Sequence, residues 1–159
     1  MNATRNTDVR LAALARIVER EAKHLATTDT RLFQPLLSTD DIAALETNED
    51  LAERVEAFIG RFGRLQDTLG DKLLPALLAR LGDRPAGLLD NLDRAERLGW
   101  IEDANQWINI RDLRNKMVHE YMEDPTLLAD ALNSGHHFAA DLIGTAGRMT
   151  AEVKARIAS

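Results

Sequence analysis

The run Arg114–Tyr121, RNKMVHEY, carries an arginine, a histidine and a tyrosine within eight residues, and together these residue types suit phosphate chemistry. On an ideal helix, which advances about 100° per residue, six apolar or aromatic side chains fall on one arc. They are Trp107, Ile110, Leu113, Met117, Val118 and Tyr121. Arg114 falls near the middle of this arc, and a guanidinium is rarely buried unless it is paired. The pattern therefore predicts either a carboxylate partner for Arg114, with Asp67 or Asp71 as candidates, or a cleft lined by the arc.

The same run contains the groups required to cleave RNA without a metal. Such cleavage needs activation of the ribose 2′-OH, stabilisation of the charge on the phosphorane, and a proton for the leaving oxygen. His119 can act as acid or base, and its place near a helix C-terminus favours the imidazolium that a general acid needs. Arg114 offers charged donors that match phosphate oxygens, and Asn115 can orient the ring of His119 or hold a phosphate oxygen. Arg111 is a supporting candidate because it adds local positive charge.

The spacing of Arg114 and His119 raises a geometric difficulty. Five residues on an ideal helix separate the two side chains by roughly 140°. The Arg114 and His119 side chains of one chain are therefore not expected to contact the same phosphate. Two copies of this helix meeting at a two-fold axis would bring two of each side chain to one cleft. Distortion of the last helical turn is the weaker alternative.

The elements that must position these residues are helices throughout. The spacing of apolar residues predicts an all-α, single-domain, up-and-down bundle of about five helices over residues 1–159, as a two-fold homodimer. We expect helices over about 7–27, from about 49 to a kink near Gly70 and Pro75 and on through 73–81, over 86–98, from 103 to the Asp124-Pro125 pair, and from Pro125 onward. Residues 28–48 are a long connection with a short helical turn around 41–45.

Local signals refine these helices. Asp103 is predicted as the N-cap of the helix that carries the run, with Gln106 as its capping-box partner. Asp124 is expected to cap the last helix, with Pro125 at its first position. The buried stripe of that helix is predicted to consist of Leu128, Leu132, Phe138, Leu142, Ala146, Met149 and Val153. Gly60 and Gly63 predict a close approach of backbones along the long helix.

Composition excludes several classes of function. The chain has no cysteine, which excludes disulfides, thiolate metal sites and cysteine nucleophiles. The formal net charge of −6 means that any phosphate-binding surface must be local. No apolar run approaches the roughly 20 residues that span a bilayer, and the first residues lack the apolar core of a signal peptide. We therefore expect a cytoplasmic protein, and one without a cofactor. We also expect no metal site, because the adjacent His136 and His137 point about 100° apart and cannot chelate together.

The motif Arg-Asn-x-x-x-His-x-Tyr, on the penultimate helix of a small α-bundle, resembles the HEPN family (higher eukaryotes and prokaryotes nucleotide-binding) in its HepT-type toxin branch. The similarity extends over about residues 51–142 and includes the segments 61–67, RFGRLQD, and 70–75, GDKLLP. The first helix and its connection are less diagnostic.

This resemblance implies a homodimeric, metal-independent ribonuclease toxin with a composite active site that acts on RNA, with tRNA as one candidate. It implies catalytic roles for Arg114 and His119, with Asn115 as the polar neighbour that the family favours. It also implies a partner, a minimal nucleotidyltransferase antitoxin, which would block Tyr121 by transferring AMP to it. An adduct on Tyr121 could reach Arg114, because seven residues place both on nearly the same face.

Structural explanations compete with these roles. Arg114 could serve only in an ion pair, His119 could be a surface residue, and Tyr121 could be a core residue with its hydroxyl at the rim. The alternative function is a non-catalytic helical module that binds a nucleotidyltransferase and positions its nucleotide or substrate. A third is a regulatory helical protein that binds another protein through its apolar arcs.

Overall fold

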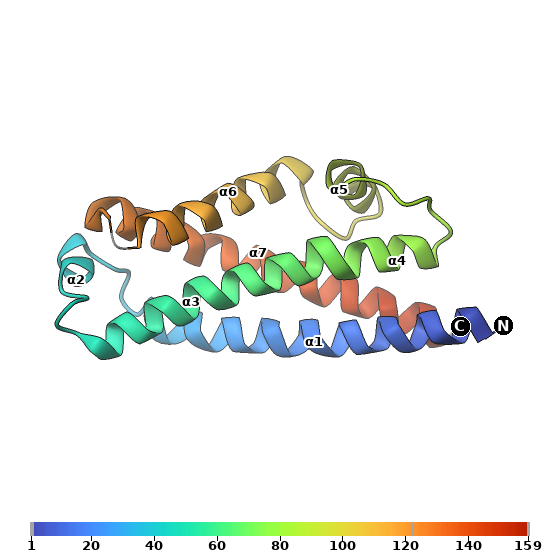
Figure 1. Ribbon diagram of the computed structural model, residues 1–159, viewed down its shortest axis with the longest axis horizontal. Coiled ribbons are helices and arrows are strands. Elements are labelled where there is room, and N and C mark those ends of the chain that lie inside the picture. The colour runs from blue at the N-terminus through green and yellow to red at the C-terminus, as the bar shows by residue number, and fades with distance from the viewer. Residues whose placement is uncertain (1, 122, 159) are drawn as a thin grey trace.

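The protein is built from long helices that pack along one another. The computed structural model describes residues 2–121 and 123–158, and within these ranges it contains no strand. The elements in chain order are α1 (Asn2–Leu32), α2 (Thr39–Ala43), α3 (Glu49–Asp67), the π-helix η1 (Thr68–Leu73), α4 (Leu74–Arg80), α5 (Leu88–Arg97), α6 (Ala104–Glu120) and α7 (Pro125–Ala158). Since α3, η1 and α4 are continuous, the described residues form six helices (Figure 1). The predicted all-α, single-domain fold is confirmed.

The first helix is longer than the apolar spacing predicted, since it spans Asn2–Leu32 instead of about 7–27. Its last turns are rich in threonine and aspartate, which are weak helix formers. Tertiary contacts outweigh that preference, because Thr28 and Leu32 are both buried. The connection is therefore shorter than 28–48. It contains α2, whose N-terminus is closed by a capping box between Ser38 and Asp41.

The kink predicted near Gly70 and Pro75 takes the form of a π-helical segment, and the helix continues through it. The backbone N–H of Leu74 donates to the carbonyl of Leu69, five residues back. Pro75 has no N–H and would leave a carbonyl of a regular α-helix without its donor. The π-helical turns of η1, in which hydrogen bonds join residues five apart, allow the helix to continue through this position. The long helical run therefore reaches α4 without a break.

Three long elements form the body of the bundle, and α6 lies across two of them. Helices α1, α3 and α7 pack against one another, with α6 over α3 and α7 (Figure 1). Gly135 of α7 allows this packing, since a Cβ there would lie 3.0 Å from Phe58 and 3.1 Å from Met117. The apolar stripe predicted on α7 is buried, except that Phe138 is only half-buried.

No helix among the described residues has the length and apolar character that a membrane crossing requires.

Candidate functional site

The helix α6 is fixed at its N-terminal end by polar contacts that the sequence predicted only in part. Asp103 is the N-cap, as expected, and its carboxylate accepts from the backbone N–H of Asn105 at 2.8 Å. The predicted capping box is wrong, because Gln106 instead donates to Asp141 of α7 at 2.9 Å. At the other end, Asp124 caps α7 as predicted, accepting from the backbone of Thr126 at 2.9 Å.

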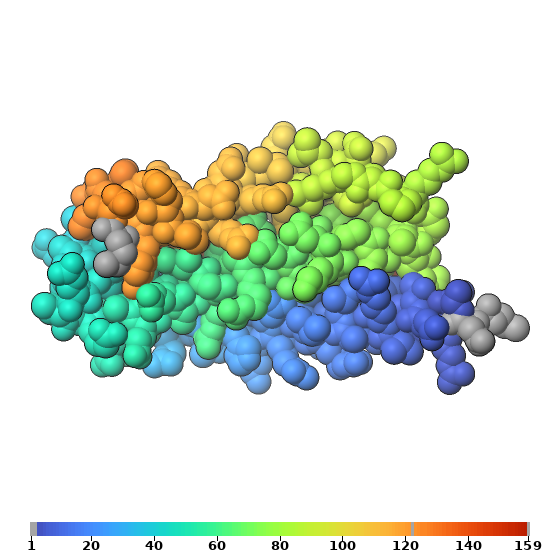
Figure 2. Space-filling model, in the orientation of Figure 1, coloured from blue at the N-terminus to red at the C-terminus, as the bar shows by residue number. Residues whose placement is uncertain are grey.

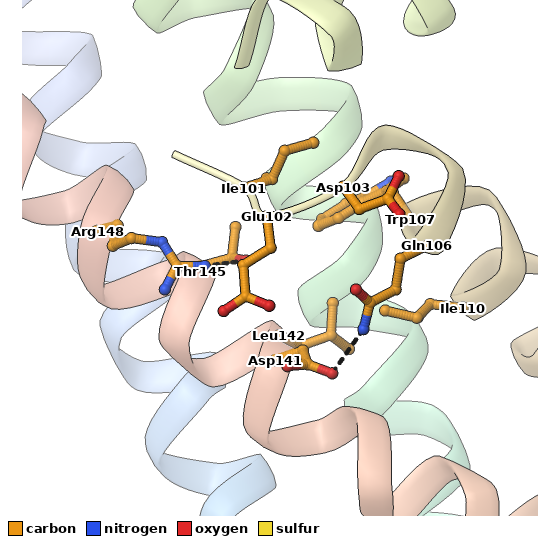
Figure 3. A pocket seen from close by; sticks show the side chains of 10 residues that line it. All are labelled: Ile101, Glu102, Asp103, Gln106, Trp107, Ile110, Asp141, Leu142, Thr145 and Arg148. Atoms are coloured by element: carbon orange, nitrogen blue, oxygen red, sulfur yellow. Dashed lines mark hydrogen bonds between the residues drawn. The ribbon is translucent and has the colours of Figure 1, made fainter. Parts of the chain in front are cut away.

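A small hollow lies beneath this end of α6, between α6 and α7 (Figure 3). The Gln106–Asp141 hydrogen bond crosses one side of it (Figure 3). On the other side, Arg148 donates to the carbonyl of Trp100 at 2.9 Å. Its volume of about 20 Å³ has room for about one water molecule. The hydrogen bonds beside the hollow hold this end of α6 in place, and the hollow itself is too small for a substrate.

Three side chains spaced seven residues apart on α6 meet three positions spaced seven apart on the antiparallel α3–η1 run. Trp107 lies over Gly70, where an added Cβ would be 3.2 Å from its ring. Arg114 lies over Gly63. Two turns further, Tyr121 lies near the carboxylate of Glu56. We call Trp107, Arg114 and Tyr121 the inner flank of α6. Figure 2 shows atoms of α6 lying against those of α3 on the side of the molecule in view.

Arg114 occupies a site on α3 that only glycine leaves open. A Cβ at Gly63 would lie 2.7 Å from Nε of Arg114 and 3.2 Å from Cζ, closer than such contacts allow. One guanidinium nitrogen, Nη1, donates to Oδ1 of Asp67 at 2.5 Å. Of the two carboxylates that the sequence suggested, Asp67 is therefore the partner, and Asp71 is not.

This ion pair leaves Arg114 able to bind a second anion. A guanidinium has five N–H donors, and the contact with Asp67 uses one of them. The Arg114 side chain remains 29% exposed, and that of Asp67 44% exposed. A phosphate can therefore reach Arg114, but it must share the positive charge with Asp67.

The remaining motif residues lie on the solvent side of α6. Arg111, Asn115, Val118 and His119, which we call the outer flank, are all exposed. Within the described part of the chain, the side chains of His119 and Asn115 have no hydrogen-bond partner. Arg114 turns towards α3 while His119 turns towards solvent, so one chain does not bring the two to a common point.

Tyr121 ends α6 in a half-buried position. Burial raises the pKa of its phenol above the ordinary value, and the carboxylates of Glu56 and Glu49 raise this pKa further. The α3 side of the inner flank is consequently acidic near Tyr121. The phenol stays protonated at neutral pH and is partly open to solvent.

Two predictions are wrong, the burial of Val118 on α6 and the close approach of backbones at Gly60 and Gly63. Val118 is 58% exposed and does not join the buried side of α6. Gly60 meets no neighbouring helix, and Gly63 accommodates a side chain instead of a backbone. Arg61 points away from α6, because it donates to Thr28 and to the carbonyl of His24, both on α1.

The two adjacent histidines of α7 do not act together. His136 Nδ1 lies 2.7 Å from Oδ1 of Asp29 on α1, and its ring stacks on Phe33 at 4.6 Å. His137 is exposed. Within residues 2–121 and 123–158, no group of three His, Asp or Glu side chains could hold a metal ion.

The part of the site that sequence reasoning missed is the role of the two glycines. Gly63 and Gly70 are seven residues apart, as are Arg114 and Trp107. This matched spacing on two antiparallel helices could have predicted which residues meet. Comparisons of the chain with known family models, curated proteins and solved structures found no match. What the site does must therefore be inferred from its own residues.

Proposed function

We propose that this protein is a metal-independent endoribonuclease that acts as a homodimer, in which the C-terminal halves of two α6 helices line one cleft and the outer flank of each copy faces the exposed side of Arg114 in the other. The observation that carries the proposal is the division of the motif between the two flanks of α6. Arg114 is held rigidly with donors to spare, whereas His119 and Asn115 are exposed without partners among the described residues. A second copy supplies the missing half of each pair. The exposed Val118, between Asn115 and His119, suits such an interface.

The proposed reaction needs only the side chains of this chain. One His119 removes the proton from the ribose 2′-OH, and the 2′ oxygen attacks the adjacent phosphorus. The bond from phosphorus to the 5′ oxygen breaks, and the other His119 protonates that oxygen. The products are a 2′,3′-cyclic phosphate and a 5′-OH. Arg114 stabilises the charge on the phosphorane, with Asn115 and Arg111 in supporting positions.

We also propose that a nucleotidyltransferase partner silences the enzyme at Tyr121. Transfer of AMP from ATP to the phenol oxygen would release pyrophosphate and leave an anionic adduct. Glu56 and Glu49 repel that charge, while Arg114, two turns away on the inner flank, attracts it. The adduct would therefore occupy the phosphate position of the substrate.

The test is cleavage of pooled RNA, with purified tRNA as one arm, in the presence of EDTA. We expect activity that falls by roughly 10²-fold or more in His119→Ala. His137→Ala is the matched control, because it removes an exposed histidine from α7 and should leave activity unchanged. Activity that requires a divalent ion, or that survives His119→Ala, would contradict the proposal.

A second function, the non-catalytic module that binds a nucleotidyltransferase, is favoured by the Arg114–Asp67 ion pair. A 2.5 Å contact is what a purely structural arginine would show. Asp67→Asn separates the two functions, because it releases Arg114 from its counterion. The ribonuclease should keep or gain activity in this variant. The module should form its complex, cleave no RNA in either form, and cause no growth arrest when expressed alone.

A further inference from the structure

A second group of arginines lies on the opposite side of α3 from Arg114. A pocket of about 220 Å³ opens between the C-terminal part of α1 and the N-terminal half of α3, which run side by side in Figure 1. Its wall includes Arg31, Arg54, Arg61 and the hydroxyl-bearing Thr28. We call it the arginine pocket.

The arginines of this pocket differ from the other half-buried arginines in the described residues. Five arginines are half-buried: Arg54, Arg61, Arg80, Arg94 and Arg114. Three of them pair with a carboxylate at 2.5–2.9 Å, namely Arg80 with Asp8, Arg94 with Asp83 and Arg114 with Asp67. Within the described part of the chain, Arg54 and Arg61 have no carboxylate oxygen within 4.0 Å. Both of these unpaired arginines line the same pocket.

The contacts of Arg61 hold its charge in place without neutralising it. Its Nη1 atom donates to Thr28 Oγ1 and, at 3.2 Å, to the carbonyl of His24. Partly buried charges in folded proteins are usually compensated by an opposite charge. A positioned guanidinium without one is a ready donor for an anion.

We propose that the arginine pocket binds the phosphoryl group of a small molecule. Guanidinium groups match tetrahedral oxyanions with charge-assisted hydrogen bonds, and here three arginines line one pocket together with a threonine. The volume accommodates one phosphoryl group with part of the molecule that carries it. Asp50 and Glu53 also line the pocket, so three positive charges face two negative ones and limit the affinity. The site is independent of RNA cleavage at α6.

The test is a titration of the ¹⁵N-labelled full chain with inorganic phosphate, followed by NMR at constant ionic strength. We expect saturable shifts centred on Thr28, Arg54 and Arg61, with a dissociation constant in the millimolar range or tighter. Glycerol phosphate as a second probe distinguishes the sources of the group. Tighter binding of the ester assigns a phosphorylated metabolite, and tighter binding of inorganic phosphate assigns the free anion.

Charge-neutral variants locate the site. Arg54→Gln should weaken phosphate binding by roughly tenfold or more, as should Arg61→Gln where circular dichroism shows that it folds. Arg64→Gln is the matched control, since Arg64 is exposed on α3 and does not line the pocket. The double variant Asp50→Asn, Glu53→Gln should tighten binding. Shifts that do not saturate, or equal affinity in Arg54→Gln and Arg64→Gln, would overturn the proposal.

Discussion

The two flanks of α6 differ in how many contacts their side chains make within a single chain. On the inner flank, Trp107 and Arg114 each meet a glycine, and Arg114 also has a counterion in Asp67. On the outer flank, Asn115 and His119 have no partner among the described residues. Residues of one eight-residue motif are thus divided between a packed surface and an open one. The difference teaches that substitutions on the inner flank should reduce stability, whereas those on the outer flank should reduce function alone.

Removing the largest inner side chain should break the packed flank most severely. Trp107 is 5% exposed, and its ring lies against Gly70. Trp107→Ala should therefore lower the free energy of unfolding by about 3–5 kcal/mol, measured by urea denaturation. Leu89→Ala, at a 65% exposed position on α5, should change it little. Equal losses in the two variants would show that Trp107 is not packed as described.

Filling the gap under Arg114 should have the next largest effect. Gly63→Val places side-chain atoms where the guanidinium lies, and such overpacking costs about 1–3 kcal/mol of stability. Gly60→Ala, on the same helix but without a neighbouring helix at that position, should be neutral or stabilising. Adding Arg114→Ala to Gly63→Val should recover part of the loss. A simple sum of the two single effects in the double variant would mean that the residues do not interact.

The third inner position can be followed by its own absorbance. Tyr121 is the single tyrosine of the chain, so an ultraviolet pH titration reports its phenol directly. The midpoint should lie above the ordinary tyrosine pKa of about 10, and Glu56→Gln should lower it. Because the folded pKa is raised, the associated stability is present below the unfolded pKa and is lost as the pH rises through the folded value. Glu53→Gln, an exposed change on the same helix, should leave the midpoint unchanged.

The outer flank should give the smallest change in stability. Asn115→Ala and His119→Ala remove exposed side chains without partners in the described residues. Each should alter the free energy of unfolding by no more than about 0.5 kcal/mol, measured by urea denaturation at a concentration where the chain is monomeric. A loss of 2 kcal/mol or more, by this rule, would assign the residue to packing.

The sequence predicted the helices well because their apolar spacing is regular. The stripe of α7 and the caps at Asp103 and Asp124 are local signals, and all of them are found, apart from the half-buried Phe138 of the stripe. The extension of α1 to Leu32 could not be predicted, because it depends on contacts with distant helices that outweigh weak local propensity. The π-helix η1 was predicted only as a kink. Pro75 indicates that one backbone hydrogen bond is missing, but the sequence does not indicate that the helix adopts π-helical turns there.

The candidate site was predicted in part. The sequence predicts Asp67 or Asp71 as the partner of Arg114, because a charge on an apolar arc needs a counterion, and Asp67 is the one that pairs with it. Val118 was placed on the buried arc because angle alone cannot tell where α3 and α7 leave α6 uncovered. The unpaired Arg54 and Arg61 carry no sequence signal, since pairing depends on the approach of α1 to α3.

The central claim is that the C-terminal halves of two α6 helices meet at one cleft, and a single cysteine tests it most directly. The chain has no cysteine, so Val118→Cys introduces a unique thiol between Asn115 and His119. Under mild oxidation, we expect a disulfide-linked dimer to form rapidly in this variant on a non-reducing gel. Val9→Cys is the matched control, because Val9 is 63% exposed on α1, away from the motif. A Val118→Cys protein that stays monomeric, or that links no faster than Val9→Cys, would contradict the composite site.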